Sequence, residues 1–132
     1  MNFLVIGFAG LACLLHIAFG VVEVGYPQLI LGIKTTELPE STRLVFYNQG
    51  FYNFFLALGG LYGIHTSIQP KKMSAILTFV LLSMVGASIV LFQSKPELIS
   101  GALVQGLPPF FALIASVIFT KKDPKEINHG IL

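Results

Sequence analysis

Residues 73–94 read MSAILTFVLLSMVGASIVLFQS and contain no Asp, Glu, Lys or Arg. Three further stretches, 1–22, 44–70 and 98–120, are also free of these charged residues. Each stretch meets the length of about 20 mainly apolar residues that a membrane-crossing helix requires. The sequence therefore predicts an all-α fold, in which four transmembrane helices form the bundle of an integral membrane protein.

The composition excludes most classes of soluble protein. Of the 132 residues, 55% are hydrophobic and 11% are charged, whereas a typical soluble domain is about 25% charged. The formal net charge of +2 is too small to indicate a nucleic-acid partner. The single cysteine, Cys13, cannot form an intramolecular disulfide, and no metal-binding or phosphate-binding motif is present. We therefore expect membrane lipid as a partner, and no cofactor.

Two short proline-containing links divide the apolar stretches. Pro70 and Pro96 interrupt the chain next to lysines, and links this short make successive helices antiparallel neighbours. The expected helices span about 3–24, 42–66, 72–93 and 98–120, within one domain, 1–120, followed by a polar cytoplasmic tail, 121–132.

The basic residues predict an orientation in the membrane. An even number of spans places both termini on the same side, and that side holds more lysines than the other. By the positive-inside rule, both termini lie in the cytoplasm and the protein crosses the cell membrane several times. The five residues on the terminal side are Lys71, Lys72, Lys121, Lys122 and Lys125, and the three on the other side are Lys34, Arg43 and Lys95.

The connection at about 25–41 is longer than the others and contains Pro27, Gly32 and Pro39. Connections of this length are uncommon unless they act as lids or binding loops. Its apolar residues 29–33 are too few to cross a membrane. Two interpretations stay open, an interfacial linker and a lid over the bundle.

Six polar side chains on three of the predicted helices lie in the same, outer half of the bundle. Polar groups within hydrocarbon usually face a bundle interior or a wet cavity. At 1.5 Å per residue, Glu23 lies within a few Å of the outer boundary, whereas His16 and Asn53 lie about 12–16 Å below it. The inner halves of these helices are almost entirely apolar. The pattern predicts an outward-opening polar pocket above an apolar plug, lined by His16, Glu23, Asn48, Gln49, Asn53 and Gln105, with Tyr52 beside Asn48.

Pairs of small residues four positions apart indicate close helix packing, because they let backbones approach in lipid. The same pairs are compatible with a homodimer interface. They are Gly59 with Gly63, Ser83 with Ala87, and Ala102 with Gly106.

The segment 48–57, NQGFYNFFLA, resembles the signature of the domain-of-unknown-function 1304 family. His16, Phe19 and Glu23 are similar to the first-helix pattern of that family, and 104–108, VQGLP, to its last-helix pattern. One departure is Pro109-Phe110, where the family pattern has a small residue after the first proline. The resemblance implies a small integral membrane protein of four helices with these polar positions, and it implies no activity.

Three functions fit the sequence. The first is a protein that binds or translocates a small amphipathic molecule, whose polar end the pocket amides orient; translocation would require a homodimer. The second is an intramembrane enzyme of the isomerase or hydratase type, acting on a lipid-like substrate with His16 and Glu23 as catalytic acid and base. One His and one Glu are too few ligands for catalytic zinc. The third is a structural or accessory membrane subunit. The predicted ligand-binding residues are His16, Glu23, Asn48, Gln49, Tyr52, Asn53 and Gln105.

Overall fold

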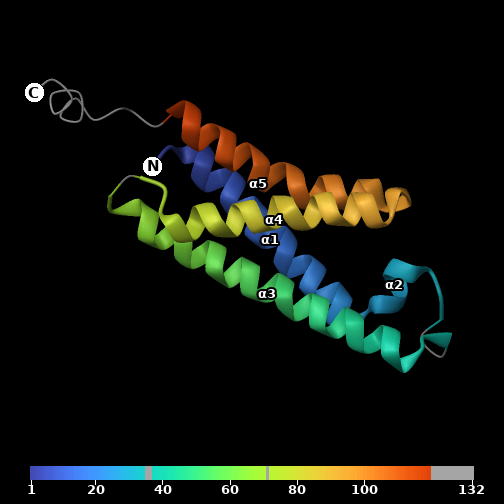
Figure 1. The fold of residues 1–132 in the computed structure, drawn as a ribbon. Helices are drawn as coiled ribbons and strands as arrows, with labels where there is room; N and C mark the ends of the chain where they lie inside the picture. Colours follow the sequence, from blue (N-terminus) through green and yellow to red (C-terminus); the bar gives the residue numbers. More distant parts are fainter. Residues whose placement is uncertain (35–36, 71, 120–132) are drawn as a thin grey trace, which may run out of the picture.

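The computed structural model describes residues 1–34, 37–70 and 72–119. Within these ranges the chain forms helices and no strands, so the predicted all-α class is confirmed (Figure 1). The predicted tail and Lys71, Lys121, Lys122 and Lys125 lie outside the described residues. The elements are α1 (Phe3–Gly25), α2 (Pro27–Leu31), α3 (Glu40–Ile68), α4 (Ala75–Ser94), the 3-10 helix η2 (Pro96–Leu98) and α5 (Ile99–Phe119).

Three segments are long and apolar enough to cross a membrane. Among the described residues these are α1, α4 and the segment Pro96–Phe119, which joins η2 to α5. The fourth long helix, α3, has 29 residues but does not meet the same hydropathy criterion. Its amides near one end and its His65, Thr66 and Ser67 near the other reduce its apolar character.

Local capping interactions explain where several helices begin and end. The Asn2 side chain accepts a hydrogen bond from the Leu4 N–H at 2.9 Å and caps α1. Ser74 caps α4, since its hydroxyl oxygen accepts from the Leu77 N–H at 3.2 Å. Pro27 starts α2 with a preset φ angle, and Gly32 ends it at a φ of 64°.

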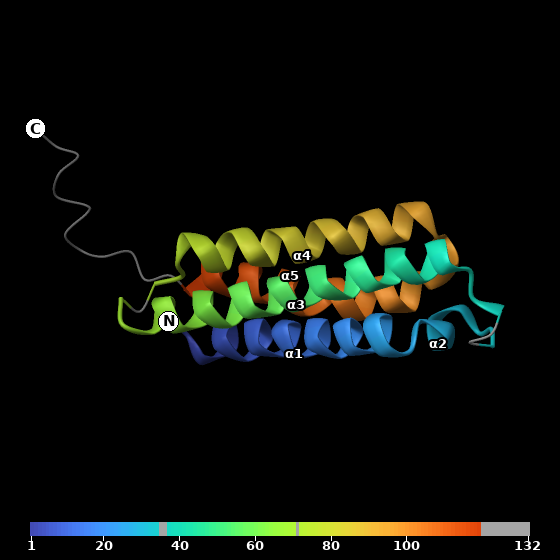
Figure 2. The ribbon, with the colours of Figure 1, turned by 90° about the horizontal axis from the view of Figure 1, so that it is seen from below.

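The four long helices form two antiparallel pairs, α1 with α3 and α4 with α5 (Figures 1 and 2). We call the end where α1 begins and α5 ends the terminal end, and the opposite end the α2 end. The contacts of α3 glycines with α4 lie in the terminal half: a Cβ on Gly63 would lie 2.8 Å from the Leu77 Cα, and one on Gly59 would lie 3.1 Å from Val80. The two pairs diverge towards the α2 end, as Figure 1 shows.

Glycines hold α1 and α3 together in the α2 half. A Cβ built on Gly20 would lie 2.9 Å from the carbonyl oxygen of Gly50, and a Cβ on Gly50 would lie 2.9 Å from that of Gly20. The two backbones therefore touch directly. This contact fixes which stripe of α3 faces α1.

The apolar core fills the terminal half, where the sequence predicts an apolar plug. Small residues dominate it, so the helices approach closely around a few larger side chains. Its buried members are Ala9, Ala12, Cys13, Ala57, Leu77, Val80, Leu81, Met84 and Ala112.

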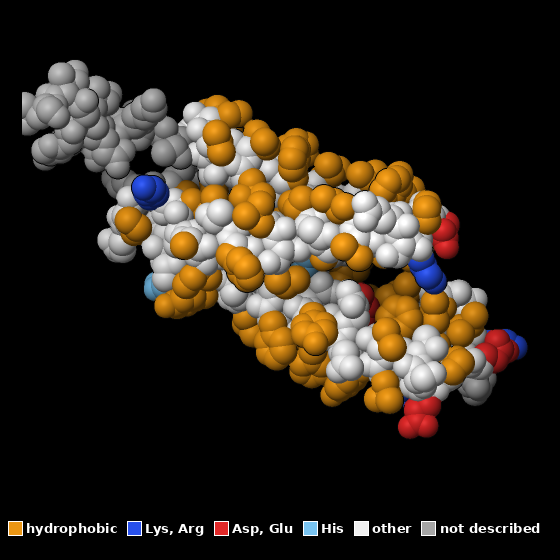
Figure 3. Space-filling model, viewed as in Figure 1, with side chains coloured by type: hydrophobic (Ala, Val, Ile, Leu, Met, Phe, Trp, Pro, Cys, Tyr) orange, Lys and Arg blue, Asp and Glu red, His pale blue; other side chains and the backbone are white. Residues whose placement is uncertain are grey.

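The surface between the two ends is apolar. Large hydrophobic side chains such as Phe79 (71% exposed) and Val117 (78% exposed) point outward. Charged side chains gather at the two ends and in one recess (Figure 3). A soluble monomer rarely exposes so large an apolar area, whereas a bilayer would cover it.

Candidate functional site

A hydrogen bond between α1 and α3 joins two of the predicted site residues. The Asn53 side-chain N–H donates to the Glu23 carboxylate at 2.6 Å. Asn53 is buried and Glu23 is half-buried. Helical side chains lean towards the N-terminus of their own helix, so the Glu23 carboxylate leans from the α2 end into the bundle. It therefore reaches deeper than its position in the sequence suggested.

His16 is fully buried on the same face of α1 as Gly20, one helical turn closer to the terminal end. Its Nδ1 lies 2.9 Å from the carbonyl oxygen of Ala12. A carbonyl oxygen only accepts, so Nδ1 carries the proton, and in the neutral ring Nε2 is an acceptor. Within the part of the chain that the structure describes, Nε2 has no hydrogen-bond partner.

Gln105 on α5 is 7% exposed, and its side chain makes no hydrogen bond within 1–34, 37–70 or 72–119. The rings of Phe8 and Phe111 are 5.6 Å apart and set the register of α1 against α5. From that contact, His16 lies about 12 Å and Gln105 about 9 Å towards the α2 end. The two side chains are therefore at nearly the same level, on neighbouring helices.

Two buried prolines follow Gln105 one turn later. Pro108 and Pro109 have no N–H, so the carbonyls of Val104 and Gln105 cannot receive the usual i+4 hydrogen bond. The turn of α5 that carries Gln105 thus has two carbonyl oxygens without their usual i+4 donor, as well as a side-chain amide. The sequence indicated this feature through the two prolines, although we did not predict the role of these carbonyls.

Three predicted residues do not join the other four, His16, Glu23, Asn53 and Gln105, which we call the polar cluster. Asn48, Gln49 and Tyr52 have exposed side chains, with Tyr52 at 65%. The expectation that Asn48 and Gln49 point into the bundle interior is therefore wrong. The reason is the glycine contact: Gly50 faces α1, and at about 100° per residue this turns Gln49 and Asn48 away from α1.

The connecting helix α2 packs on a different face of α1. It closes a small apolar groove of about 190 Å³, lined by Leu15, Ala18, Phe19, Val22 and Ile30. These α1 positions are not those that carry His16 and Gly20. The structure thus places α2 beside the end of α1, and the polar cluster is not part of this groove.

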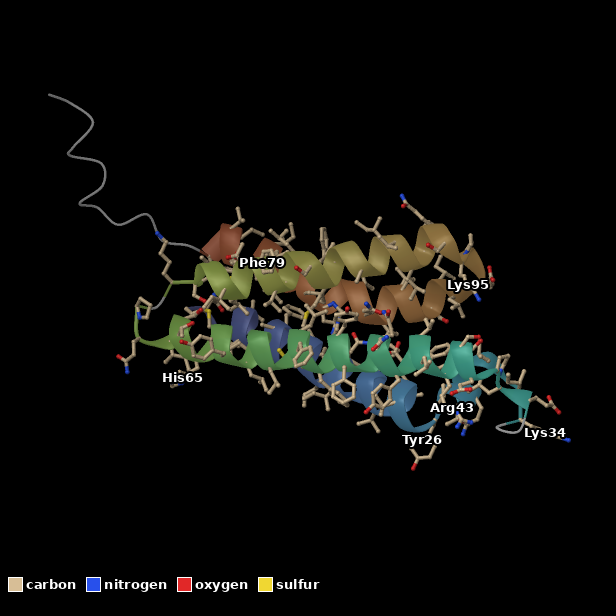
Figure 4. The ribbon with its side chains drawn as sticks, turned by 60° about the horizontal axis from the view of Figure 1, so that its bottom comes forward. Tyr26, Lys34, Arg43, His65, Phe79 and Lys95 are labelled. Atoms are coloured by element: carbon tan, nitrogen blue, oxygen red, sulfur yellow. The ribbon has the colours of Figure 1, made fainter. Side chains whose placement is uncertain are left out.

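The polar cluster lies where the two helix pairs begin to diverge. The space-filling view shows a recess between the pairs towards the α2 end, with acidic surface inside it (Figure 3). Lys95, at the end of α4, and Arg43, near the start of α3, lie at this same end of the molecule (Figure 4). Among the described residues, no group of three His, Cys, Asp or Glu side chains is placed to hold a metal ion.

A comparison of the sequence with known protein families identifies one matching family. The model of the family of proteins of unknown function DUF1304 matches residues 10–117. The chain belongs to the DUF1304 family. The match includes His16, Glu23, Asn53 and Gln105. No curated protein and no solved structure matches the chain.

Proposed function

We propose that this DUF1304 protein is a four-span membrane protein that binds a small amphipathic molecule in the recess between its two helix pairs. The proposal has three parts: the fourth span, the unsatisfied polar cluster, and access from the membrane.

We infer that α3 is the fourth span. Its 29 residues extend over about 43 Å, more than the roughly 30 Å of hydrocarbon in a bilayer. It packs against α1 and α4, both apolar enough to cross a membrane. From the lysine distribution we propose that the helices cross the cell membrane with both termini in the cytoplasm and the α2 end outside.

The observation that carries the binding proposal is the unpartnered Nε2 of the fully buried His16. Polar residues that only lock a bundle should satisfy one another, because a buried polar atom without a partner costs about 1–3 kcal/mol. Glu23 and Asn53 do pair, but His16 Nε2 is buried and has no partner among the described residues. The Gln105 side chain also makes no hydrogen bond to them, although its polar atoms are not fully buried. A buried polar group of this kind is expected to form its hydrogen bond with a ligand or with water.

The shape of the recess favours an amphipathic ligand. The polar cluster lies beside it, and the α5 turn that carries Gln105 also has exposed apolar residues, such as Val104. A polar head would reach the cluster while an apolar tail stays against these side chains and lipid. Translocation of such a molecule would require more than four helices, so for transport we propose a homodimer.

An experiment on co-purifying compounds tests binding. The protein would be purified from its membranes in a mild detergent, and bound small molecules would be extracted and analysed by mass spectrometry. We expect one class of amphiphile to be enriched in the wild type and lost from His16→Leu. Tyr52→Leu, a surface control, should keep it. Equal amounts in all three proteins would contradict the proposal.

A second candidate is an intramembrane isomerase or hydratase on a lipid-like substrate. The open Nε2 of His16 favours it, because a neutral imidazole with a free lone pair can act as a base. Glu23 would then be the acid, although its carboxylate bonds to Asn53 and not to His16. Conversion of a bound amphiphile to an isomeric or hydrated product, lost in both His16→Leu and Glu23→Gln, would support this candidate.

A further inference from the structure

The polar cluster contains more hydrogen-bond acceptors than donors. The acceptors are the Glu23 carboxylate, His16 Nε2 and the side-chain oxygens of Asn53 and Gln105. The backbone carbonyls of Val104 and Gln105 add to them, because the prolines remove their usual i+4 donors. Of the donors, the Asn53 amide already bonds to Glu23. The remaining side-chain donors among these four residues are the second N–H of Asn53 and the amide group of Gln105.

An excess of acceptors around one carboxylate selects a cationic donor. A protonated primary amine carries three N–H donors and one positive charge. Three acceptor side chains, on α1 and α5, could receive those donors, and Glu23 would balance the charge in surroundings where an unpaired ion is costly. A carboxylate or phosphate head would instead meet the Glu23 charge and leave the acceptors unsatisfied.

We propose that the ligand of this site is an amphiphile with a primary ammonium head, held by Glu23, His16 and Gln105. This inference rests on the proposed function and specifies its ligand. Such a head occurs on free alkylamines and on phospholipids with an ethanolamine head group. Lys95 and Arg43, both exposed at the same end, favour an anionic head, so an anion is part of the test.

The test compares three water-soluble probes that share a six-carbon tail, namely hexylammonium, hexanol and hexanoate. Thermal unfolding would be followed by circular dichroism in an uncharged detergent. We expect hexylammonium to raise the midpoint by about 3 °C or more, and the other two probes to leave it unchanged. In a second arm, micelles doped with phosphatidylethanolamine are compared with micelles doped with phosphatidylcholine, whose head has no N–H. Stabilisation only by phosphatidylethanolamine identifies the lipid as the source, and stabilisation only by hexylammonium identifies a free amine; both results support the ammonium head.

Variants show which residues are responsible for the stabilisation by hexylammonium. Glu23→Gln should abolish the hexylammonium shift, and Gln105→Met should reduce it at least about twofold. Glu97→Gln is the matched control, because Glu97 is an exposed carboxylate in η2 at the same end of the bundle. Protection of the buried Cys13 thiol from a maleimide confirms that each variant is folded.

The outcomes separate the two proposals. Stabilisation of the wild type by hexanol or hexanoate, and not by hexylammonium, overturns the ammonium head and leaves the binding site standing. A hexylammonium shift that persists in both Glu23→Gln and Gln105→Met also overturns the inference. If no probe and neither lipid shifts the wild type, both the inference and the proposed function fail.

Discussion

Replacing Gly50 by alanine should loosen the whole bundle, because this position lies at the backbone contact between α1 and α3. The new Cβ would lie 2.9 Å from the carbonyl oxygen of Gly20 and 2.6 Å from a methyl group of Val24, whereas ordinary contacts begin at 3.4 Å. The methyl group of Val24 can rotate away. The Gly20 carbonyl belongs to a helix backbone, so α1 and α3 must separate by about half an ångström.

The cost follows from overpacking of a tightly packed interface, which is typically about 1–3 kcal/mol. A loss of 2 kcal/mol raises the fraction of unfolded molecules about 30-fold. Gly20→Ala affects the same contact from the α1 side, because its new Cβ would lie 2.9 Å from the carbonyl oxygen of Gly50. The double variant should therefore cost less than the sum of the single variants, because the first substitution already separates the helices.

The single cysteine supplies the assay. Cys13 is fully buried in the core, so the rate at which a maleimide labels it in detergent reports how often the bundle opens. We expect faster labelling in Gly50→Ala and Gly20→Ala. Gly10→Ala and Gly86→Ala are controls, since a Cβ at either position meets nothing within 4 Å. Labelling of Gly50→Ala at the rate of these controls would refute the close contact.

Three further predictions concern the site, a cap and the topology. Asn53→Leu should destabilise the protein by about 1–3 kcal/mol in detergent unfolding, because it removes the Glu23 partner at 2.6 Å, whereas Tyr52→Leu, at an exposed position, should be nearly neutral. Ser74→Ala should cost about 1 kcal/mol in the same assay, because this hydroxyl caps α4 and also bonds to Thr66 and to the Gly63 carbonyl; Ser83→Ala, which loses one bond within its own helix, is the control, and an equal cost for both would contradict the capping role. In a Cys13→Ala background, cysteines at positions 37 and 95 should react with an impermeant thiol reagent applied to intact cells, and a cysteine at position 72 should not; the reverse pattern would invert the proposed orientation.

The elements of the fold were largely predictable from the sequence. Charge-free stretches locate the long helices to within a few residues, because few other structures place so many apolar residues in succession. The expected start of the second helix, at about 42, lies close to the observed Glu40. The short helix α2 was not predicted, although Pro27 and Gly32 mark both of its ends.

The candidate site was predictable only in part. His16, Asn53 and Gln105 are buried as expected, because each lies on a stripe of small residues. Asn48 and Gln49 were misplaced, since polarity alone does not show which of two adjoining helix faces meets a neighbour. The deciding residue is Gly50, whose missing side chain allows the α1 backbone to approach. The divergence of the two helix pairs depends on contacts distant in the sequence, and periodicity does not reveal it.

The most direct test of the central claim is to map where an amphiphile binds. The purified protein would be irradiated with a photoactivatable alkyl ligand, and the labelled peptides would be identified by mass spectrometry, with and without excess unlabelled ligand. Labelling that the competitor suppresses should fall on residues 16–23, on Asn53 and on residues 99–106, which carry the polar cluster. Labelling spread equally over the lipid-facing stretches 58–62 and 79–82, and insensitive to the competitor, would contradict the existence of a binding site between the helix pairs.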